Sequence, residues 1–261
     1  IKVETDEAGR LRPEELERRI GDSRAAGKVP FFIGATAGTT VKGAYDPFRE
    51  IGPLAREHGC WFHVDGSLGG TALLSPRYRS LLDGLDQADS FVWNAHKLMG
   101  LPLICSVFLV REKGRLFASN SVTGADYIFH EDTNGTADLG PFSLQCGRRV
   151  DALNLWLSWK FYGDTGYAER VDRFFDLAAY AEEIVRKNPR LELMAPRSSV
   201  TVCFRYLPPT VEESSDFNLR LREELARSGL SLVNYTYLGG DLAMRLVIAN
   251  HELAREDVEM F

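Results

Sequence analysis

The chain alternates short apolar runs with longer segments of helical spacing. Apolar runs predict strands at 1–4, 31–35, 61–64, 90–93 and 106–110, and segments with one apolar face predict helices at 13–26, 48–58 and about 75–85. Pro13 suits a first helical turn, and Asp46 followed by Pro47 is typical of a helix N-cap. The run at 31–35 is apolar throughout, which is typical of a strand buried on both faces. This alternation indicates an α/β fold with a mostly parallel sheet.

The second part of the chain continues the alternation. Helices are expected at 150–161, 167–187, 213–228 and 252–261, and strands at 191–194, 200–204, 231–235 and 243–248. Residues about 119–142 are rich in Gly, Asp, Thr and Asn with little periodicity, which predicts a long functional or mobile loop. We therefore expect a larger domain at 1–149, which includes this loop, and a small α/β domain at 150–261.

Polar residues follow three of the predicted strands of the larger domain. The hydroxyl-rich stretch 36–40 follows the first, Asp65 ends the second, and Lys97 follows the third. Because the carboxyl ends of parallel strands share one edge of a sheet, where ligands bind in such folds, we expect these groups to lie close together.

A lysine and an aspartate at such an edge suit pyridoxal phosphate. A lysine amine can form a Schiff base with the cofactor aldehyde, and a carboxylate can keep the ring nitrogen protonated. His96 and the hydroxyls of Thr39 and Thr40 could bind the phosphate or the ring hydroxyl. From the residues alone, other interpretations stay open: a surface lysine, a helix-capping Asp65 and a core histidine.

Composition narrows the class of partner. The chain has 261 residues, 44% hydrophobic and 26% charged, with a net charge of −6 and no Lys/Arg-rich run, so nucleic acid is not an expected partner. The four cysteines are far apart and form no metal-binding pattern, so no metal is expected. No signal peptide or membrane-spanning stretch is recognisable, and we expect reduced thiols in a cytoplasmic protein.

Four stretches resemble one enzyme family. They are 32–47 (FIGATAGTTVKGAYDP), 61–65 (WFHVD), 93–100 (WNAHKLMG) and 143–151 (SLQCGRRVD). In order and spacing they are similar to the group II pyridoxal-phosphate-dependent amino-acid decarboxylases, closest to the glutamate and cysteine-sulfinate branch. The resemblance runs the whole chain and implies the aspartate-aminotransferase-like fold, fold-type I.

The resemblance also implies roles for individual residues. Lys97 would hold the cofactor as a Schiff base, Asp65 would pair with the pyridinium, Thr40 would lie near the cofactor and His96 would contact its phosphate. Arg245 would bind the substrate α-carboxylate, since a guanidinium matches a planar carboxylate with two parallel hydrogen bonds. Gly66 and Asn94 complete the implied cofactor site. The implied reaction is decarboxylation of a small acidic L-amino acid.

The chain departs from the family pattern in two motifs. In the family pattern two alanines follow the strand aspartate, whereas this chain has Gly66 and Ser67. We interpret the change from alanine to Gly66 as the loss of a methyl group from below the cofactor. No tyrosine stands just before the 143–151 motif, where the family's loop proton donor is expected, so Tyr127 or His130 would have to substitute. A slow proton donor favours transamination or oxidative deamination as an alternative outcome.

The resemblance covers the later half of the family's chain. Either this sequence is a fragment of a longer chain, or the enzyme is cleaved or encoded in two pieces. We expect the earlier half to come from a second or cleaved polypeptide, so the protein would be a homo-oligomer or a hetero-oligomer with the chain that carries that half. A further alternative is an inactive subunit that stabilises a catalytic partner.

Overall fold

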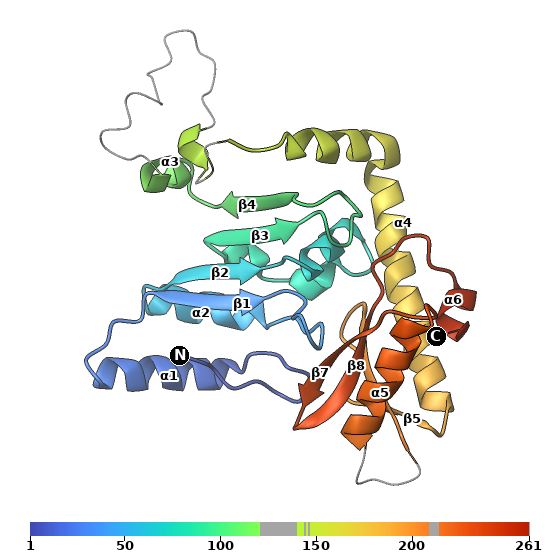
Figure 1. Ribbon diagram of the computed structural model, residues 1–261. Helices are drawn as coiled ribbons and strands as arrows, with labels where there is room; N and C mark the ends of the chain where they lie inside the picture. The colour runs from blue at the N-terminus through green and yellow to red at the C-terminus, as the bar shows by residue number, and fades with distance from the viewer. Residues whose placement is uncertain (121–139, 144, 146, 209–213, 261) are drawn as a thin grey trace.

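The computed structural model describes residues 1–120, 140–143, 145, 147–208 and 214–260 (Figure 1). Tyr127, His130 and most of the predicted loop lie outside the described residues. Among the described residues, no helix is long and apolar enough to cross a membrane. The same residues contain no group of three or more His, Cys, Asp or Glu side chains placed to hold a metal ion.

The first sheet is mixed and mostly parallel, as the alternating pattern predicts. Its strands, in spatial order, are β1 (Phe32–Thr36), β2 (Trp61–Asp65), β3 (Ser90–Asn94) and β4 (Ser106–Val110). The first three are parallel, and β4 runs antiparallel to β3. In Figure 1 the arrowheads of β1, β2 and β3 point the same way, so these strands end at one edge.

Only one face of this sheet is buried, so the prediction that the 31–35 run is buried on both faces is wrong. Ile33 and Ala35 lie in the core, whereas Phe32 is 51% exposed. The chain's own helices, α1 (Pro13–Ala25) and α2 (Phe48–Glu57), contribute buried residues to the same core cluster as Ile33. The opposite face carries a row of aromatic rings, in which His63 lies between Phe32 and Phe108.

Two local predictions in this part are corrected. Residues 1–4 form no strand: only Thr5 makes a single bridge to Leu11, because a turn ending at Gly9 reverses the chain. Asp46 does not cap α2. Its carboxylate instead accepts the backbone N–H groups of Leu11 and Thr36, both at 2.7 Å, and so ties two distant segments together.

The segment predicted as one helix at 75–85 is broken into short 3-10 turns. They are η2 (Arg79–Leu82) and η3 (Leu85–Gln87), after η1 (Gly69–Leu74). Gly84, with φ +94°, separates η2 from η3, and a Cβ there would lie 2.4 Å from the Arg49 backbone nitrogen. This close approach to α2 requires glycine and prevents a continuous helix.

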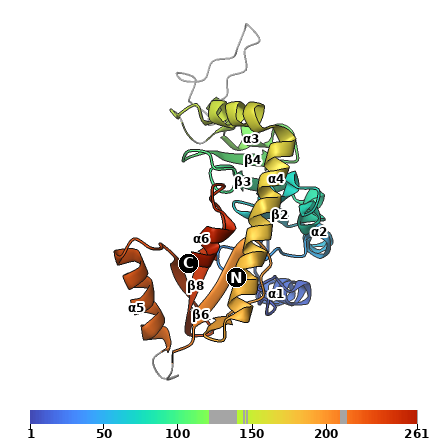
Figure 2. The ribbon, with the colours of Figure 1, turned by 90° about the vertical axis from the view of Figure 1, so that its right-hand side faces the viewer.

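One long helix, α4 (Asp151–Lys187), replaces the two helices predicted there. Its backbone is non-helical at Gly163 (φ 66°, ψ −177°), so the two predicted segments exist but are joined across a kink. Figures 1 and 2 show α4 running beside both sheets of the molecule. The short α3 (Arg115–Asn120) and η4 (Gly140–Phe142) were not predicted.

The second sheet is antiparallel, in the order β5-β6-β8-β7. Its strands are β5 (Leu191–Leu193), β6 (Thr201–Tyr206), β7 (Asn234–Leu238) and β8 (Asp241–Val247), and its helices are α5 (Ser214–Arg227) and α6 (Arg255–Met260). The predicted strand 231–235 begins three residues later than expected. The predicted domain boundary near Arg149 stays a prediction.

Candidate active site

Asp65 is the last residue of β2 and lies exposed at the carboxyl edge of the sheet. Its Oδ1 accepts the backbone N–H of Ser67 at 2.9 Å, a local turn typical of aspartate. Its backbone carbonyl accepts the N–H of Ala37 at 2.8 Å. Among the described residues Oδ2 has no hydrogen-bond partner, so one carboxylate oxygen is held and the other is available to a ligand.

Lys97 lies in a tight turn directly after β3, in which its N–H donates to the Asn94 carbonyl at 3.0 Å. Lys97 is exposed, but the next two side chains, Leu98 and Met99, are buried. Arg170, a buried residue of α4, donates to the Met99 carbonyl at 2.5 Å. The backbone is therefore anchored while the amine, which forms no ion pair within the described part of the chain, stays free.

The backbone of Cys105 orients His96. The Nδ1 atom lies 2.9 Å from the Cys105 carbonyl oxygen and 3.1 Å from the Cys105 amide nitrogen. That carbonyl already accepts the His96 N–H at 3.2 Å, whereas the amide has no other acceptor among the described residues. Both contacts engage Nδ1, so Nε2 is the ring nitrogen left to contact an anion.

The other predicted site residues come from both sheets. Asn94 ends β3 beside Ser106, and Asp65 is in register with Val92, five residues before Lys97. Arg245, on β8, reaches across to the loop after β1, and its Nη1 donates to the Thr40 carbonyl at 2.5 Å. The structure thus brings Arg245 to Thr40 from 205 residues away in the sequence.

Gly66 does not open space on the side of the sheet where Asp65 lies, so its interpretation as a methyl lost from below the cofactor is wrong. A Cβ at Gly66 would point into the core, 2.2 Å from Cε2 of Phe91. Successive residues of a strand face opposite sides, and Phe91 belongs to the buried side. Contact between Gly66 and the cofactor, which stays a prediction, is therefore expected through the backbone.

Substitution of Gly66 by alanine is expected to destabilise the fold by about 1–3 kcal/mol, because the added methyl overpacks against the Phe91 ring. Urea unfolding measures this loss. The matched control is Gly21→Ala in α1, where nothing lies within 4 Å of the new Cβ and helix propensity predicts a gain. A Phe91→Leu change should recover part of the Gly66→Ala loss, and strictly additive effects would contradict the steric explanation.

The described residues fit pyridoxal phosphate by the chemistry of their free donors and acceptors. Lys97 has an unpaired amine on an anchored turn, Asp65 has a free carboxylate oxygen, and His96 presents a free Nε2. Asp65 ends β2 and Lys97 follows the adjacent parallel strand β3, at the same edge of the sheet. This fold and this set of groups define the fold-type I class of pyridoxal-phosphate proteins.

The chain belongs to the pyridoxal-dependent decarboxylase family. The model of the pyridoxal-dependent decarboxylase conserved domain matches residues 1–207, and pyridoxal 5′-phosphate is the cofactor of that family.

Two known proteins and one solved structure show how close the similarity is. The chain is 41% identical to cysteine sulfinic acid decarboxylase of Mus musculus, over 98% of this chain and 55% of that protein. It is 37% identical to the acidic amino acid decarboxylase GADL1 of Bos taurus, over 98% and 52% respectively. The crystal structure of mouse CSAD in apo form superposes with a TM-score of 0.90 at 38% identity, covering 98% of this chain and 56% of that one. The chain thus spans about half the length of these relatives.

Sequence reasoning missed three contributors to the site. The Ser67 backbone N–H holds Asp65, the Cys105 backbone orients His96, and Arg170 supports the Lys97 turn. An Asp followed two residues later by Ser is a turn signal that could have indicated the first contact. The other two depend on residues 9 and 71 positions apart in the sequence, and no local pattern signals them.

Proposed function

We propose that this chain forms part of an enzyme that decarboxylates a small acidic L-amino acid with pyridoxal phosphate. The observation that carries the proposal is the position of two groups at the ends of adjacent strands: the free amine of Lys97, and the carboxylate of Asp65 with one oxygen free. The names of the relatives, which act on cysteine sulfinic acid and acidic amino acids, support an acidic substrate.

Each residue would have a distinct task in this reaction. The bound cofactor supplies an electron sink for the charge left when the substrate loses carbon dioxide. Lys97 would attach the cofactor through its amine, and Asp65 Oδ2 would keep the proton on the ring nitrogen. His96 would contact the phosphate through Nε2, which donates to it when protonated. Arg245 would bind the α-carboxylate with the N–H groups that Thr40 does not occupy.

Product analysis tests this function. The purified protein, loaded with pyridoxal phosphate, is incubated with cysteine sulfinate, aspartate and glutamate, and amine, carbon dioxide, aldehyde and ammonia are measured. Amine and carbon dioxide in equal amounts support decarboxylation. Aldehyde with ammonia, formed with consumption of dissolved oxygen, would replace it by the decarboxylation-dependent oxidative deamination that the absence of a tyrosine just before residue 143 favours. No turnover and no cofactor binding would leave only a stabilising subunit.

We also propose that a further polypeptide covers the open face and edge of the first sheet. This polypeptide would be equivalent to the part of the relatives that this chain does not span. Trp61 N–H donates to the Phe31 carbonyl and Ala37 N–H to the Asp65 carbonyl, so alternate residues of β1 face β2. The backbone groups of Phe32 and Gly34 therefore face the free edge, which is a template for another strand.

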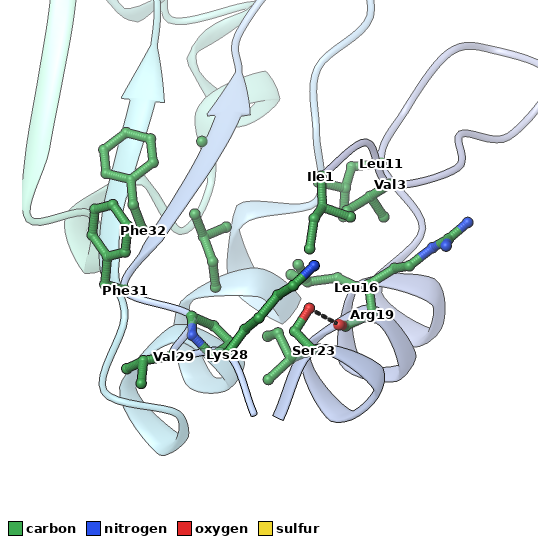
Figure 3. Close-up of a pocket in the computed structure, with 14 residues that line it drawn as sticks. Ile1, Val3, Leu11, Leu16, Arg19, Ser23, Lys28, Val29, Phe31 and Phe32 are labelled. Carbon is green, nitrogen blue, oxygen red and sulfur yellow. Dashed lines mark hydrogen bonds between the residues drawn. The ribbon is translucent and has the colours of Figure 1, made fainter. Parts of the chain in front are cut away.

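An apolar cavity of about 390 Å³ borders that edge (Figure 3). Its lining comes from the first residues, α1 and the start of β1, and includes Ile1, Leu16, Val29, Phe31 and Phe32. Phe31 is 76% exposed, and such an apolar surface marks an interaction site. Native mass spectrometry of the active material tests the proposal. An active homogeneous species made only of this 261-residue chain would contradict it.

A cytoplasmic location is part of the same proposal, because the three cysteines found free in the described residues, Cys60, Cys105 and Cys203, are buried thiols. Cell fractionation tests it, and recovery with an oxidised extracellular fraction would contradict it.

A further inference from the structure

The loop after β1 is held by the second sheet at three nearby residues. Arg245 Nη1 donates to the Thr40 carbonyl at 2.5 Å, and the Sγ of Cys203 lies 3.2 Å from the Val41 carbonyl oxygen. Gly43 approaches so closely that a Cβ there would lie 1.9 Å from Ser199 Oγ. Residues 39–43, here called the tethered loop, are therefore fitted against β6 and the residues that precede it.

The two side chains that reach this loop are neighbours. Cys203 on β6 is in register with Arg245 on β8, and residues paired across an antiparallel ladder point to the same face of the sheet. One of them contacts the carbonyl of residue 40 and the other the carbonyl of residue 41. Cys203 and Arg245 therefore hold consecutive peptide groups of the tethered loop.

The Cys203 thiol is built to act as a donor. Cys203 is 3% exposed, and burial raises the pKa of its thiol to about 11, although the positive charges of Arg245 and Lys42 oppose that rise. The S–H group is therefore kept near neutral pH and can donate to the Val41 carbonyl. The same burial makes this cysteine a poor nucleophile and a poor metal ligand.

Hydrogen bonds between its two ends close the tethered loop into a ring, so a displacement of Val41 also displaces Thr40. Gly43 N–H donates to the Thr39 carbonyl at 2.8 Å, and Ala44 N–H donates to Thr39 Oγ1 at 3.0 Å. Gly38 and Thr39 both donate to the Ala44 carbonyl at 2.9 Å. These bonds close a short ring of backbone around Thr40 and Val41. Arg245 and Cys203 contact the tip of this ring, and the neighbouring Lys42 donates from Nζ to the Glu7 carbonyl at 2.8 Å.

We propose that Cys203 is a positioning residue for carboxylate recognition: its thiol holds the Val41 carbonyl, which keeps the Thr40 carbonyl where it orients the guanidinium of Arg245. This inference rests on the proposed function, in which Arg245 binds the substrate α-carboxylate. A guanidinium has five N–H donors in a rigid plane, so a hydrogen bond from Nη1 to Thr40 fixes the direction in which the remaining donors point.

Loss of the thiol is expected to affect substrate binding more than the chemical step. In Cys203→Ala, the Val41 carbonyl loses its donor, so the Thr40 carbonyl shifts more easily and the guanidinium that it orients turns away from the carboxylate position. We expect KM for the amino acid to rise about 3- to 10-fold, the factor that corresponds to one hydrogen bond, with kcat changed less than 2-fold. Cys203→Ser retains a donor at this position and should restore much of the loss.

The test compares Cys203→Ala, Cys203→Ser and the matched control Cys60→Ala in the cofactor-loaded protein. Cys60 is also a buried thiol, but it lies after α2, and its Sγ contacts the His58 carbonyl only at 3.9 Å. Two quantities are measured: the kinetic constants with the amino acid, and the hydrogen exchange rates of the Gly43 and Ala44 amides in the protein without substrate.

The outcomes separate this inference from the proposed function. Faster exchange at Gly43 and Ala44 in Cys203→Ala, with the KM rise and partial rescue by serine, supports the inference. Unchanged exchange overturns it whether or not the protein turns over any amino acid. Faster exchange with unchanged KM overturns the link to carboxylate recognition. An equal KM rise in Cys60→Ala would show that the effect comes from a general loss of stability, and this result also overturns the inference.

Discussion

Replacing Lys97 with alanine is expected to reduce turnover by on the order of 10⁴-fold or more, the scale of loss when a covalent nucleophile is removed. The amine is the atom that would attach the cofactor, and the structure offers no second lysine at this turn. The backbone is held independently, by the buried Leu98 and Met99 and by Arg170, so the fold should persist. Turnover and the thermal unfolding midpoint are measured on the same preparation.

Covalent labelling makes this prediction independent of the substrate. Borohydride reduction of the cofactor-loaded protein should leave a pyridoxyl mass on the peptide that contains Lys97, and the alanine variant should show none. Lys113→Ala, an exposed lysine in the turn after β4, is the matched control and should label and turn over normally. A pyridoxyl group on any other lysine, or turnover retained by the Lys97 variant, would contradict the assignment.

Asp65→Asn is expected to lower kcat by about 10²- to 10³-fold, the range for loss of one preorganised electrostatic partner. The asparagine oxygen can still accept the Ser67 N–H, so the turn that follows β2 is preserved. What disappears is the negative charge that we propose lies beside the ring nitrogen and keeps that nitrogen protonated. The kinetic constants and the cofactor dissociation constant are both measured.

The control for this variant removes the charge of an aspartate that lies outside the site. Asp83→Asn removes a surface carboxylate that pairs with Arg49 at 3.1 Å, and such exposed pairs contribute little to stability. It should leave kcat unchanged. A kcat for Asp65→Asn within a few-fold of the unmodified protein would show that this carboxylate does not serve the ring nitrogen.

The sequence predicted the positions of Asp65 and Lys97 because those positions depend on neighbouring residues in the chain. A strand is recognised from five or so consecutive residues, and a polar residue at its carboxyl end must lie at the sheet edge. Asp65 and Lys97 were placed in this way, and the structure puts both at the ends of adjacent parallel strands. The kink in α4 was also visible in sequence, as a break between two periodic segments around Gly163.

The errors came from positions where distant segments meet. Asp46 is followed by proline and has the local pattern of a helix cap, but two backbone donors, Leu11 and Thr36, compete for its carboxylate. The family pattern suggested that Gly66 leaves space near the cofactor. In the structure, the Phe91 ring occupies the place that a methyl group on residue 66 would take. In both cases the deciding partner is at least ten residues away.

For this protein, the amino-acid order by itself determined the strand and helix periods, the residues at the strand ends and, through four motifs, the family. Tertiary structure alone decided which sheet face stays open, which His96 nitrogen is free and which loop meets Arg245. The physical reason is range. Backbone period and turn chemistry depend on neighbours in sequence, whereas burial, close approach and hydrogen bonding between the two sheets depend on atoms that only folding brings into contact.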